Sequence, residues 1–498
     1  MPTVPLPQDP SLDQLRNQAR ELQRAVRTGD AGARAMVAEF HPDPPAPDRF
    51  PLSAAQLVLA RKYRFASWTR LRRHVEIINT RAWTPGRPAP AGEPLADRFL
   101  RLACLSYRDD VSADHAAPAR LLAQHPELPS TNIAVAAACA DVDQVRRFLA
   151  GDRSSATATA GPYDWSPLLY QAYARVDPDL DRDATLRTAR MLLEAGADPN
   201  DGRFWHGLPT PFTVLTGVFG SGEQDQSRHP HAIAFARLLL EAGADPNDGQ
   251  ALYNRMFSPD DDHLVLLFEF GLGRGDGGPW RRLLGDAVES PAVMLRNLLW
   301  WAITHDQRAR VGLLAQHGVD IVTPFTELRV PTADKHTPVE VALLNGHREL
   351  AGQLRELGAP AARLDPVEAF VAAALAGDAD AVRSADAAVV AAAQRARPGL
   401  VAWAASTGAP DSAELLVQAG FDVNAFGRND APVDQPWETA LHVAAGDGNL
   451  PLAETLLALG ADPQLRDARF DGTPLDWARH FDRPELIELL QPLTPEPD

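Results

Sequence analysis

Along most of the chain, apolar residues recur three and four positions apart, the spacing that places them on one face of an α-helix. The first such stripe consists of Leu12, Leu15, Ala19, Leu22 and Val26. Ser11-x-x-Gln14 precedes it as a helix-capping box, and Gly29 is placed to end the helix in a left-handed turn. These signals predict a helix between Ser11 and Gly29.

Two more helices and two proline-rich gaps complete the first hundred residues. Ser53-x-x-Gln56 predicts a second helix, and a third starts near Ser67. The prolines in the gaps remove backbone donors and fix φ, so neither gap can continue a helix. We therefore predict an N-terminal helical module over residues 1–83, with one gap inside it at 42–51 and a Pro/Gly-rich linker after it over residues 84–94.

The rest of the chain is periodic. The string Leu-Leu-Glu-Ala-Gly-Ala-Asp-Pro-Asn-Asp-Gly occurs at Leu192–Gly202 and again at Leu239–Gly249. Weaker copies lie at His317–Asp320, Leu357–Pro360, Ala419–Asn424 and Leu459–Gln464. The widest interval between the motif glycines, from Gly358 to Gly420, is about two repeats of roughly 33 residues. We expect a degenerate repeat over 365–393 within it.

A second signature precedes the helices of several repeats. It is a hydroxyl residue followed by proline or alanine, which suits the cap and first turn of a helix, and it occurs at Ser166, Thr210, Thr337, Thr439 and Thr473. The two signatures together predict the same order in each repeat: a capped helix, a turn, a leucine-rich second helix, a glycine that ends it and a polar turn. One such repeat cannot bury its apolar face alone, so the repeats must stack.

These residues resemble the ankyrin-repeat family, most clearly over Glu438–Gln464. The resemblance implies an all-α ankyrin-repeat solenoid of about ten or eleven helix–turn–helix units over residues 95–491, followed by a disordered tail over 492–498. The segment from Ala55 to Val75 is similar to a leader found on some bacterial ankyrin proteins.

Some stretches depart from the repeat. Four insertions lengthen the turn between first and second helices, at Tyr107–His115, Val176–Asp183, Gly220–His231 and Ser258–His263. Pro279–Ser290 fits the pattern poorly, which leaves the repeat count open there.

Composition and charge restrict the kinds of partner and the cellular location that we expect. Residues 1–83 hold 13 Lys/Arg against 8 Asp/Glu, whereas the whole chain has a net charge of −18. An acidic body repels phosphate backbones, so a partner of the array is expected to be basic rather than a nucleic acid. No apolar run approaches the roughly 20 residues that cross a bilayer, and Met1–Pro10 lacks the features of a signal peptide. We expect a cytoplasmic monomer that makes no membrane contact.

Candidate chemistry is sparse. The sequence has no phosphate-binding loop, His-Glu-x-x-His or Cys-x-x-Cys motif, so we expect no catalytic residues, cofactor or metal. Acidic residues in the insertions offer an alternative, because carboxylates along one edge of the stack could bind a hard cation or form an enzyme site. These candidates are Asp177, Asp179, Asp181, Asp183, Asp260, Asp261, Asp262 and His263, with His229 and His231 nearby.

A basic cluster in the N-terminal module gives a second alternative. It consists of Arg61, Lys62, Arg64, Arg70, Arg72 and Arg73 around Tyr63, Phe65 and Trp68. Arg70 and Arg73 are expected on the exposed face of the third helix, where they could contact a phosphate backbone. The competing interpretation is a solvated face with Trp68 in the core.

Aromatic residues upstream of the first helices are the candidate anchors for a protein or peptide partner. The resemblance implies that these turns and the first helices line a concave binding surface, which makes Trp165, Phe204, Trp205 and Trp437 the predicted partner-binding residues. The alternative is that these rings pack between neighbouring turns. The sequence therefore favours a protein-binding scaffold, with a nucleic-acid regulator or an enzyme as the alternatives.

Overall fold

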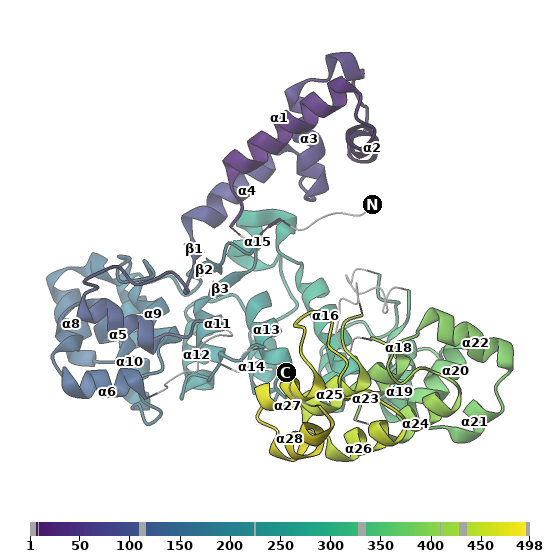
Figure 1. The fold of residues 1–498 in the computed structure, drawn as a ribbon. Coiled ribbons are helices and arrows are strands. Elements are labelled where there is room, and N and C mark those ends of the chain that lie inside the picture. The colour runs from purple at the N-terminus through teal and green to yellow at the C-terminus, as the bar shows by residue number, and fades with distance from the viewer. Residues whose placement is uncertain are drawn as a thin grey trace. The chain divides into compact units, whose positions relative to one another are not determined.

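The computed structural model describes residues 6–7, 9–108, 116–223, 226–326, 335–408, 410–427 and 436–494. It is mostly helical, which confirms that part of the expectation. The chain divides into two compact units, Met1–Met294 and Leu295–Asp498, called here the first and second units (Figure 1). Parts of the predicted insertion at Tyr107–His115 and of the predicted tail lie outside the described residues. Where the structure describes the chain, no helix has the length and apolarity to span a membrane.

The N-terminal part contains four α-helices rather than the three expected. They are α1 (Leu12–Thr28), α2 (Ala31–Phe40), α3 (Leu52–Lys62) and α4 (Trp68–Thr80), with a 3-10 turn at Pro47–Arg49. Ser11 caps α1 and Ser67 caps α4, as predicted. Helix α2 is the unexpected one, and it starts at its own cap, Asp30, directly after the glycine that ends α1. Helix α3 begins one residue before Ser53, after Pro51.

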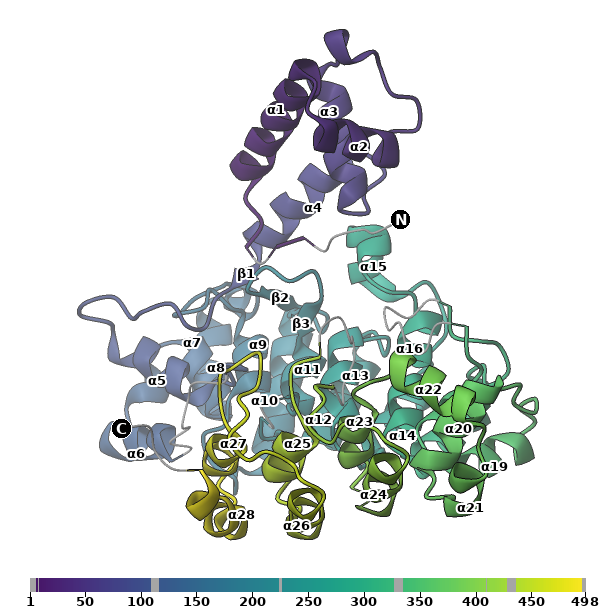
Figure 2. The ribbon, with the colours of Figure 1, turned by 45° about the vertical axis from the view of Figure 1, so that its right-hand side comes forward.

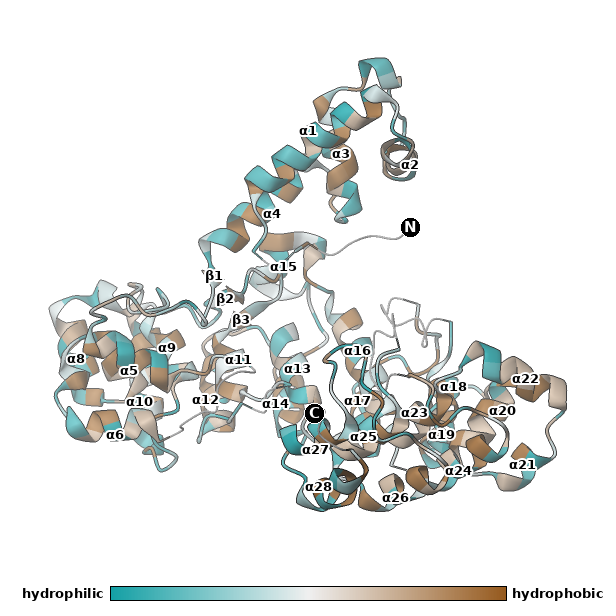
Figure 3. Cartoon of the chain, in the orientation of Figure 1, coloured by the Kyte–Doolittle hydropathy of each residue, from teal (hydrophilic) through white to brown (hydrophobic). Residues whose placement is uncertain are grey.

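These four helices enclose their own apolar core. Its fully buried members include Ala19, Phe50, Ala55 and Val58, and a second small cluster forms around Leu71 and Val75. Figure 3 shows hydrophilic and hydrophobic residues together on α1 and α4, whereas α3 is mostly hydrophobic.

In the rest of the first unit the helices stack in pairs. They are α5 (Leu95–Ala103), α6 (Ala117–Gln124), α7 (Ile133–Ala138), α8 (Val142–Gly151), α9 (Pro167–Tyr173), α10 (Arg182–Ala195), α11 (Val214–Phe219), α12 (Ala232–Glu241), α13 (Gly249–Met256), α14 (Asp262–Glu269) and α15 (Gly278–Leu284), with 3-10 turns at Leu128–Ser130, Arg153–Ala156 and Gly285–Ala287. The first helices of successive pairs, α5, α7, α9, α11 and α13, pack on one another, and the second helices α8, α10, α12 and α14 do the same. Figure 2 shows α7, α9, α11 and α13 side by side.

The second unit follows the same plan. Helix α16 (Pro291–Thr304) runs into it, followed by α17 (Arg308–Gln316), α18 (Pro338–Leu344), α19 (Arg348–Glu356), α20 (Pro366–Leu375), α21 (Ala379–Arg383), α22 (Ala387–Ala396), α23 (Leu400–Ser406), α24 (Pro410–Gln418), α25 (Ala440–Asp447), α26 (Leu450–Ala458), α27 (Pro474–His480), α28 (Pro484–Leu490) and a 3-10 turn at Gln491–Leu493. Helices α23, α25 and α27 stack in one row and α24, α26 and α28 in the other. The degenerate repeat contains α20, the short α21 and part of an additional helix, α22, which packs on α20.

The repeated eleven-residue string supplies the bonds between neighbouring pairs. The asparagine of one copy, Asn200, accepts a hydrogen bond from the backbone N–H of Asp245 (2.8 Å) in the next copy and donates to the carbonyl of Gly243 (2.9 Å). Asn424 makes the same two bonds to Asp462 and Gly460. Gly196 ends α10 at φ 112°, a backbone conformation that L side chains rarely adopt. The motif thus ends its own helix at the glycine and bonds to the next helix pair through the asparagine.

The first unit contains a small sheet that was not expected from the sequence. Its strands are β1 (Ala82–Trp83), β2 (Gly202–Trp205) and β3 (Pro211–Thr213) in the order β1-β2-β3. Strand β2 runs parallel to β1 and antiparallel to β3. The prediction that Thr210 caps a helix is therefore wrong. Thr213 caps α11 instead, through a reciprocal capping box with Thr216. The extended backbone before it places Phe212 in an aromatic cluster.

Candidate partner-binding surface

The structure separates the four predicted anchor rings into two groups. The side chains of Trp165 and Phe204 have 0% of their surface exposed, whereas Trp205 and Trp437 are half-buried. Trp165 and Phe204 therefore follow the alternative, in which the rings pack between turns.

Trp165 lies at the centre of an aromatic cluster. Its ring centroid is 4.8 Å from that of Trp83, 4.9 Å from Tyr163 and Tyr173, and 5.3 Å from Tyr170. Edge-on and tilted contacts at these separations stabilise a core beyond simple burial. Trp83, which ends the predicted N-terminal module, is thus part of the core of the array.

Phe204 and Trp205 occupy strand β2. The ring of Phe204 meets Trp280 of α15 edge-on at 5.4 Å, and the indole N–H of Trp280 donates to the carbonyl of Asn200 (3.0 Å). The indole N–H of Trp205 donates to the carbonyl of Ser106 (3.0 Å). Both rings help to hold the turn in place. The stretch that fits the repeat poorly thus supplies, through α15, a helix that covers this turn.

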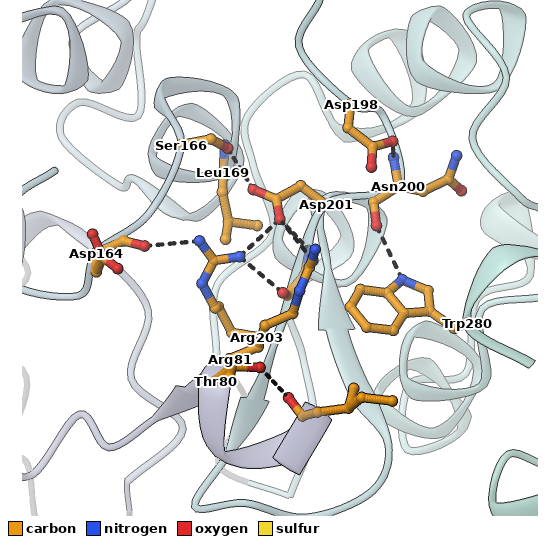
Figure 4. Close-up of polar contacts among 12 residues, drawn as sticks. Thr80, Arg81, Asp164, Ser166, Leu169, Asp198, Asn200, Asp201, Arg203 and Trp280 are labelled. Atoms are coloured by element: carbon orange, nitrogen blue, oxygen red, sulfur yellow. Dashed lines mark hydrogen bonds and ion pairs between the residues drawn. The ribbon is translucent and has the colours of Figure 1, made fainter. Parts of the chain in front are cut away.

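A polar network centred on Asp201 fixes the same turn (Figure 4). The carboxylate accepts hydrogen bonds from the hydroxyl of Ser166 (2.6 Å) and the guanidinium of Arg203 (2.7 Å). Arg203 also donates to the carbonyl of Asp164 (2.7 Å), and Arg81 forms an ion pair with Asp201 at 3.6 Å. In the next copy, Asp248 takes the place of Asp201 and accepts from the hydroxyl of Thr213.

Trp437 has a different environment, on a turn of the second unit. Its ring meets Phe470 edge-on at 5.6 Å and lies 5.3 Å from Trp477. The guanidinium of Arg469 lies over both Trp437 (5.6 Å) and Phe470 (5.1 Å). Phe470 has 64% of its surface exposed, and Phe481, which contacts Trp477, has 47%. We call these five residues the Trp437 surface.

The turn that carries Phe470 is held by Asp467. This carboxylate accepts hydrogen bonds from the backbone N–H groups of Arg469 (2.9 Å), Phe470 (2.5 Å) and Gly472 (3.0 Å) and from the indole of Trp477 (3.0 Å). Burial alone would raise the pKa of Asp467, but these hydrogen bonds outweigh it and the pKa lies below its usual value. The exposed ring is therefore presented on a rigid turn.

Trp437 lies at the start of a stretch that matches a known family. Residues 437–468 match the ankyrin repeat. The match is to the family model of that name, and it runs from Trp437 through α25 and α26. The chain is also 37% identical, over 81 residues, to a putative ankyrin repeat protein of Acanthamoeba polyphaga mimivirus. The aligned residues make up 16% of this chain and 10% of the viral protein. Ankyrin repeats generally mediate protein–protein interactions.

The matched ankyrin repeat begins with the predicted cap. Thr439 and His442 form a capping box, with the hydroxyl and Nδ1 2.8 Å apart. Nε2 of His442 lies 3.0 Å from the carbonyl of Gly472, so this side chain also bridges to the next helix pair. Burial lowers the pKa of His442, the neutral ring being favoured away from water. Phe470 lies three residues before the cap Thr473, and Trp437 lies two residues before the cap Thr439. An aromatic residue shortly before a cap was the signal that could have identified Phe470.

The insertions meet one another as expected, but arginines pair with the carboxylates of Asp260 and Asp262. His231 contacts the carbonyl of Leu180 in the preceding insertion. Arg228 pairs with Asp260 (3.5 Å) and Asp262 (2.7 Å) in the following one. Farther back, Asp181 caps α10 and Asp177 accepts from the backbone N–H of Asp179.

Asp260, Asp262 and His263 lie close enough together to offer three ligand atoms to one cation. Arg255, which is buried, donates two hydrogen bonds of 2.5 Å to Asp260. Burial alone would raise the pKa of Asp260, yet the hydrogen bonds and charge of Arg255 hold it at about 2. The carboxylate thus already has cationic partners, which argues against its use as a metal ligand.

The basic cluster faces solvent in part. Arg70 and Arg73 are exposed on α4, as predicted, while Trp68 is half-buried against the module core. Arg61 donates to the carbonyl of Phe40 (3.5 Å). Arg72 pairs with Glu76 at 3.5 Å. Part of the cluster therefore has a structural role within the module.

Proposed function

We propose that this chain is an ankyrin-repeat scaffold that binds a protein or peptide partner through the Trp437 surface. The matched repeat, the recurring eleven-residue string and the paired helices of both units support a solenoid along residues 95–491. The observation that carries the proposal is the exposure of the Phe470 ring. A ring with 64% of its surface exposed rests on a turn braced by Asp467, beside Trp437 and Arg469.

The chemistry of this surface favours anchoring. Large aromatic rings and arginine are the residues that most often supply binding energy at the centre of protein interfaces. An exposed ring on a rigid turn contributes little to folding, and it loses little conformational entropy when a partner covers it. Trp437 is half-buried and therefore serves folding as well, so Phe470 is the cleaner anchor.

The charge of the region indicates a basic partner. Residues 401–498 hold 17 Asp/Glu against 5 Lys/Arg. Such a field attracts a basic protein or peptide and accelerates its association, and the effect weakens as salt rises. An enzyme should instead present a deep pocket with convergent titratable groups, whereas Asp260 and Asp262 are paired with Arg228 and Arg255.

The test compares the full-length chain with Phe470→Ala and Trp437→Ala, using Leu357→Ala as a control with another exposed apolar side chain (41%) in the same unit. Proteins captured from a cell extract by each variant are quantified, and the protein that wild type enriches is then purified for affinity measurements. We expect Phe470→Ala to weaken binding by about thirtyfold at an unchanged melting temperature. Leu357→Ala should bind like wild type. Equal capture by wild type and Phe470→Ala would refute the proposed surface.

A further inference from the structure

The helices α1–α4 are joined to the rest of the first unit through two short connecting segments. Each of these helices packs on others of the same group, and strand β1 packs on β2 of the array. Before α1, the backbone N–H of Asp9 donates to the carbonyl of His206 (3.0 Å). After α4, residues 81–83 lie along β2. The N-terminal helices are thus a self-contained body held at its two chain connections.

The contact after α4 has the geometry of a bound extended peptide. In the parallel pairing of β1 with β2, the backbone N–H groups of Phe204 and His206 donate to the carbonyls of Arg81 (2.9 Å) and Trp83 (2.8 Å). Extended peptides commonly bind in this way, adding a strand to an exposed sheet edge while side-chain pockets supply specificity.

Five aromatic rings of the array surround Trp83. The indole has 1% of its surface exposed, with ring centroids of Tyr107, Tyr163, Trp165, Tyr173 and Phe212 between 4.8 and 6.5 Å away. Among the described residues, the indole N–H of Trp83 has no hydrogen-bond partner. Ring shape and apolar contact are therefore what the pocket recognises.

A second site recognises the residue two positions before the tryptophan. Arg81 pairs with Asp201 at 3.6 Å and lies over the ring of Trp280 at 5.3 Å. Asp201 and Trp280 both belong to the array, and both are held by other bonds, from Ser166 and to Asn200. The two sites together match an Arg-x-Trp segment in extended conformation.

We infer that this edge of the first unit is a docking site for an extended Arg-x-Trp segment, filled in the isolated chain by its own residues 81–83. A partner that carries such a segment displaces strand β1 and releases the N-terminal helices. The Pro/Gly-rich stretch 84–94 keeps the released helices tethered, so they compete with the partner as an intramolecular ligand. The site is independent of the Trp437 surface, which belongs to the second unit.

The first experiment uses the full-length chain with a protease recognition sequence inserted after Gly92, where the backbone has open space around it. The probes are a synthetic peptide of residues 78–87 and the same peptide with Trp83→Ala, added in excess to the cut protein. We expect the wild-type peptide to release the N-terminal fragment in size-exclusion chromatography and the substituted peptide to leave it bound. Release by both peptides, or by neither, would overturn the inference.

The second experiment needs no cleavage. Fluorescently labelled peptide 78–87 is titrated into full-length wild type, Trp83→Ala and Trp68→Ala, the last as a control because Trp68 packs in the module core. We expect Trp83→Ala to bind the peptide at least about thirtyfold more tightly than the other two, because its pocket is empty. If Trp83→Ala keeps its helical circular dichroism and binds no better than wild type, the pocket is only a core. If Trp83→Ala loses its helical circular dichroism, the release of the N-terminal fragment from the cleaved wild-type protein is the deciding test.

Discussion

The indole rings of Trp83 and Trp165 meet edge-on, with centroids 4.8 Å apart and an angle of 67° between their planes. Trp83 lies in strand β1, which follows the N-terminal helices. Trp165 directly precedes Ser166, the cap of helix α9 in the array. This contact joins two parts of the chain that the sequence assigns to separate modules.

Removal of the ring of Trp165 should destabilise the first unit strongly. Truncating a fully buried tryptophan leaves a cavity and costs about 3–5 kcal/mol. We expect Trp165→Ala to lower the midpoint of thermal unfolding, whereas Phe470→Ala, at an exposed position, leaves it unchanged within experimental error. Differential scanning calorimetry of both variants tests this. A drop for Phe470→Ala as large as that for Trp165→Ala would place Phe470 in the core.

The contribution of Asp248 to the stability of the first unit should fall as pH rises from about 4 to about 6. Burial raises the pKa of Asp248 from 3.8 to about 6, an effect that the hydrogen bonds from Thr213, Ala251 and Thr216 only partly offset. The folded state therefore favours the protonated form. The stabilisation is complete below pH 4 and lost above pH 6, a change of about 3 kcal/mol.

Asp248→Asn isolates this titration, because the other ionisable groups are the same in both proteins. We expect the melting temperature of wild type to fall between pH 4 and pH 7 by roughly 5–10 °C more than that of Asp248→Asn. Parallel pH profiles for the two proteins would show that Asp248 does not titrate in this range.

Calcium should not stabilise the protein. The carboxylates of Asp260 and Asp262 are paired with Arg228, and Asp260 also with Arg255, so a cation would have to displace a guanidinium. We expect melting temperatures in millimolar calcium and in EDTA to agree within about 1 °C. A saturable rise with calcium that Asp260→Asn abolishes would establish a metal site.

Limited proteolysis should begin in the proline-rich segments 42–51 or 84–94. These segments make few backbone hydrogen bonds. Exposed connections of this kind are the preferred sites of proteolytic cleavage. Mass spectrometry of the first fragments locates the cuts. Early cleavage within residues 437–490 would show that the ankyrin repeat is not the stable part of the chain.

Local signals in the sequence predicted the helices well. Ser11, Ser67, Thr439 and Thr473 cap helices where expected, because a cap is a bond between residues three positions apart. Ser53 and Thr210 do not cap the helices expected of them. In place of Thr210, Thr213 offers an equivalent cap three residues later, and only the packing of Phe212 decides between them. The candidate site was predicted less well, since Phe470 was missed and Trp165 and Phe204 are buried.

The sequence by itself determined the repeating helix pair and the bonds between identical turns. Asn200 and Asn424 make the same contacts because each copy of the motif meets the next in the same way. Only the tertiary structure decided which aromatic rings face solvent and where the N-terminal helices attach. Both depend on residues far apart along the chain, such as Trp83 and Trp165, whose meeting has no periodic signal. A ring on a turn looks alike in sequence whether a neighbour covers it, as Trp280 covers Phe204, or leaves it exposed, as at Phe470.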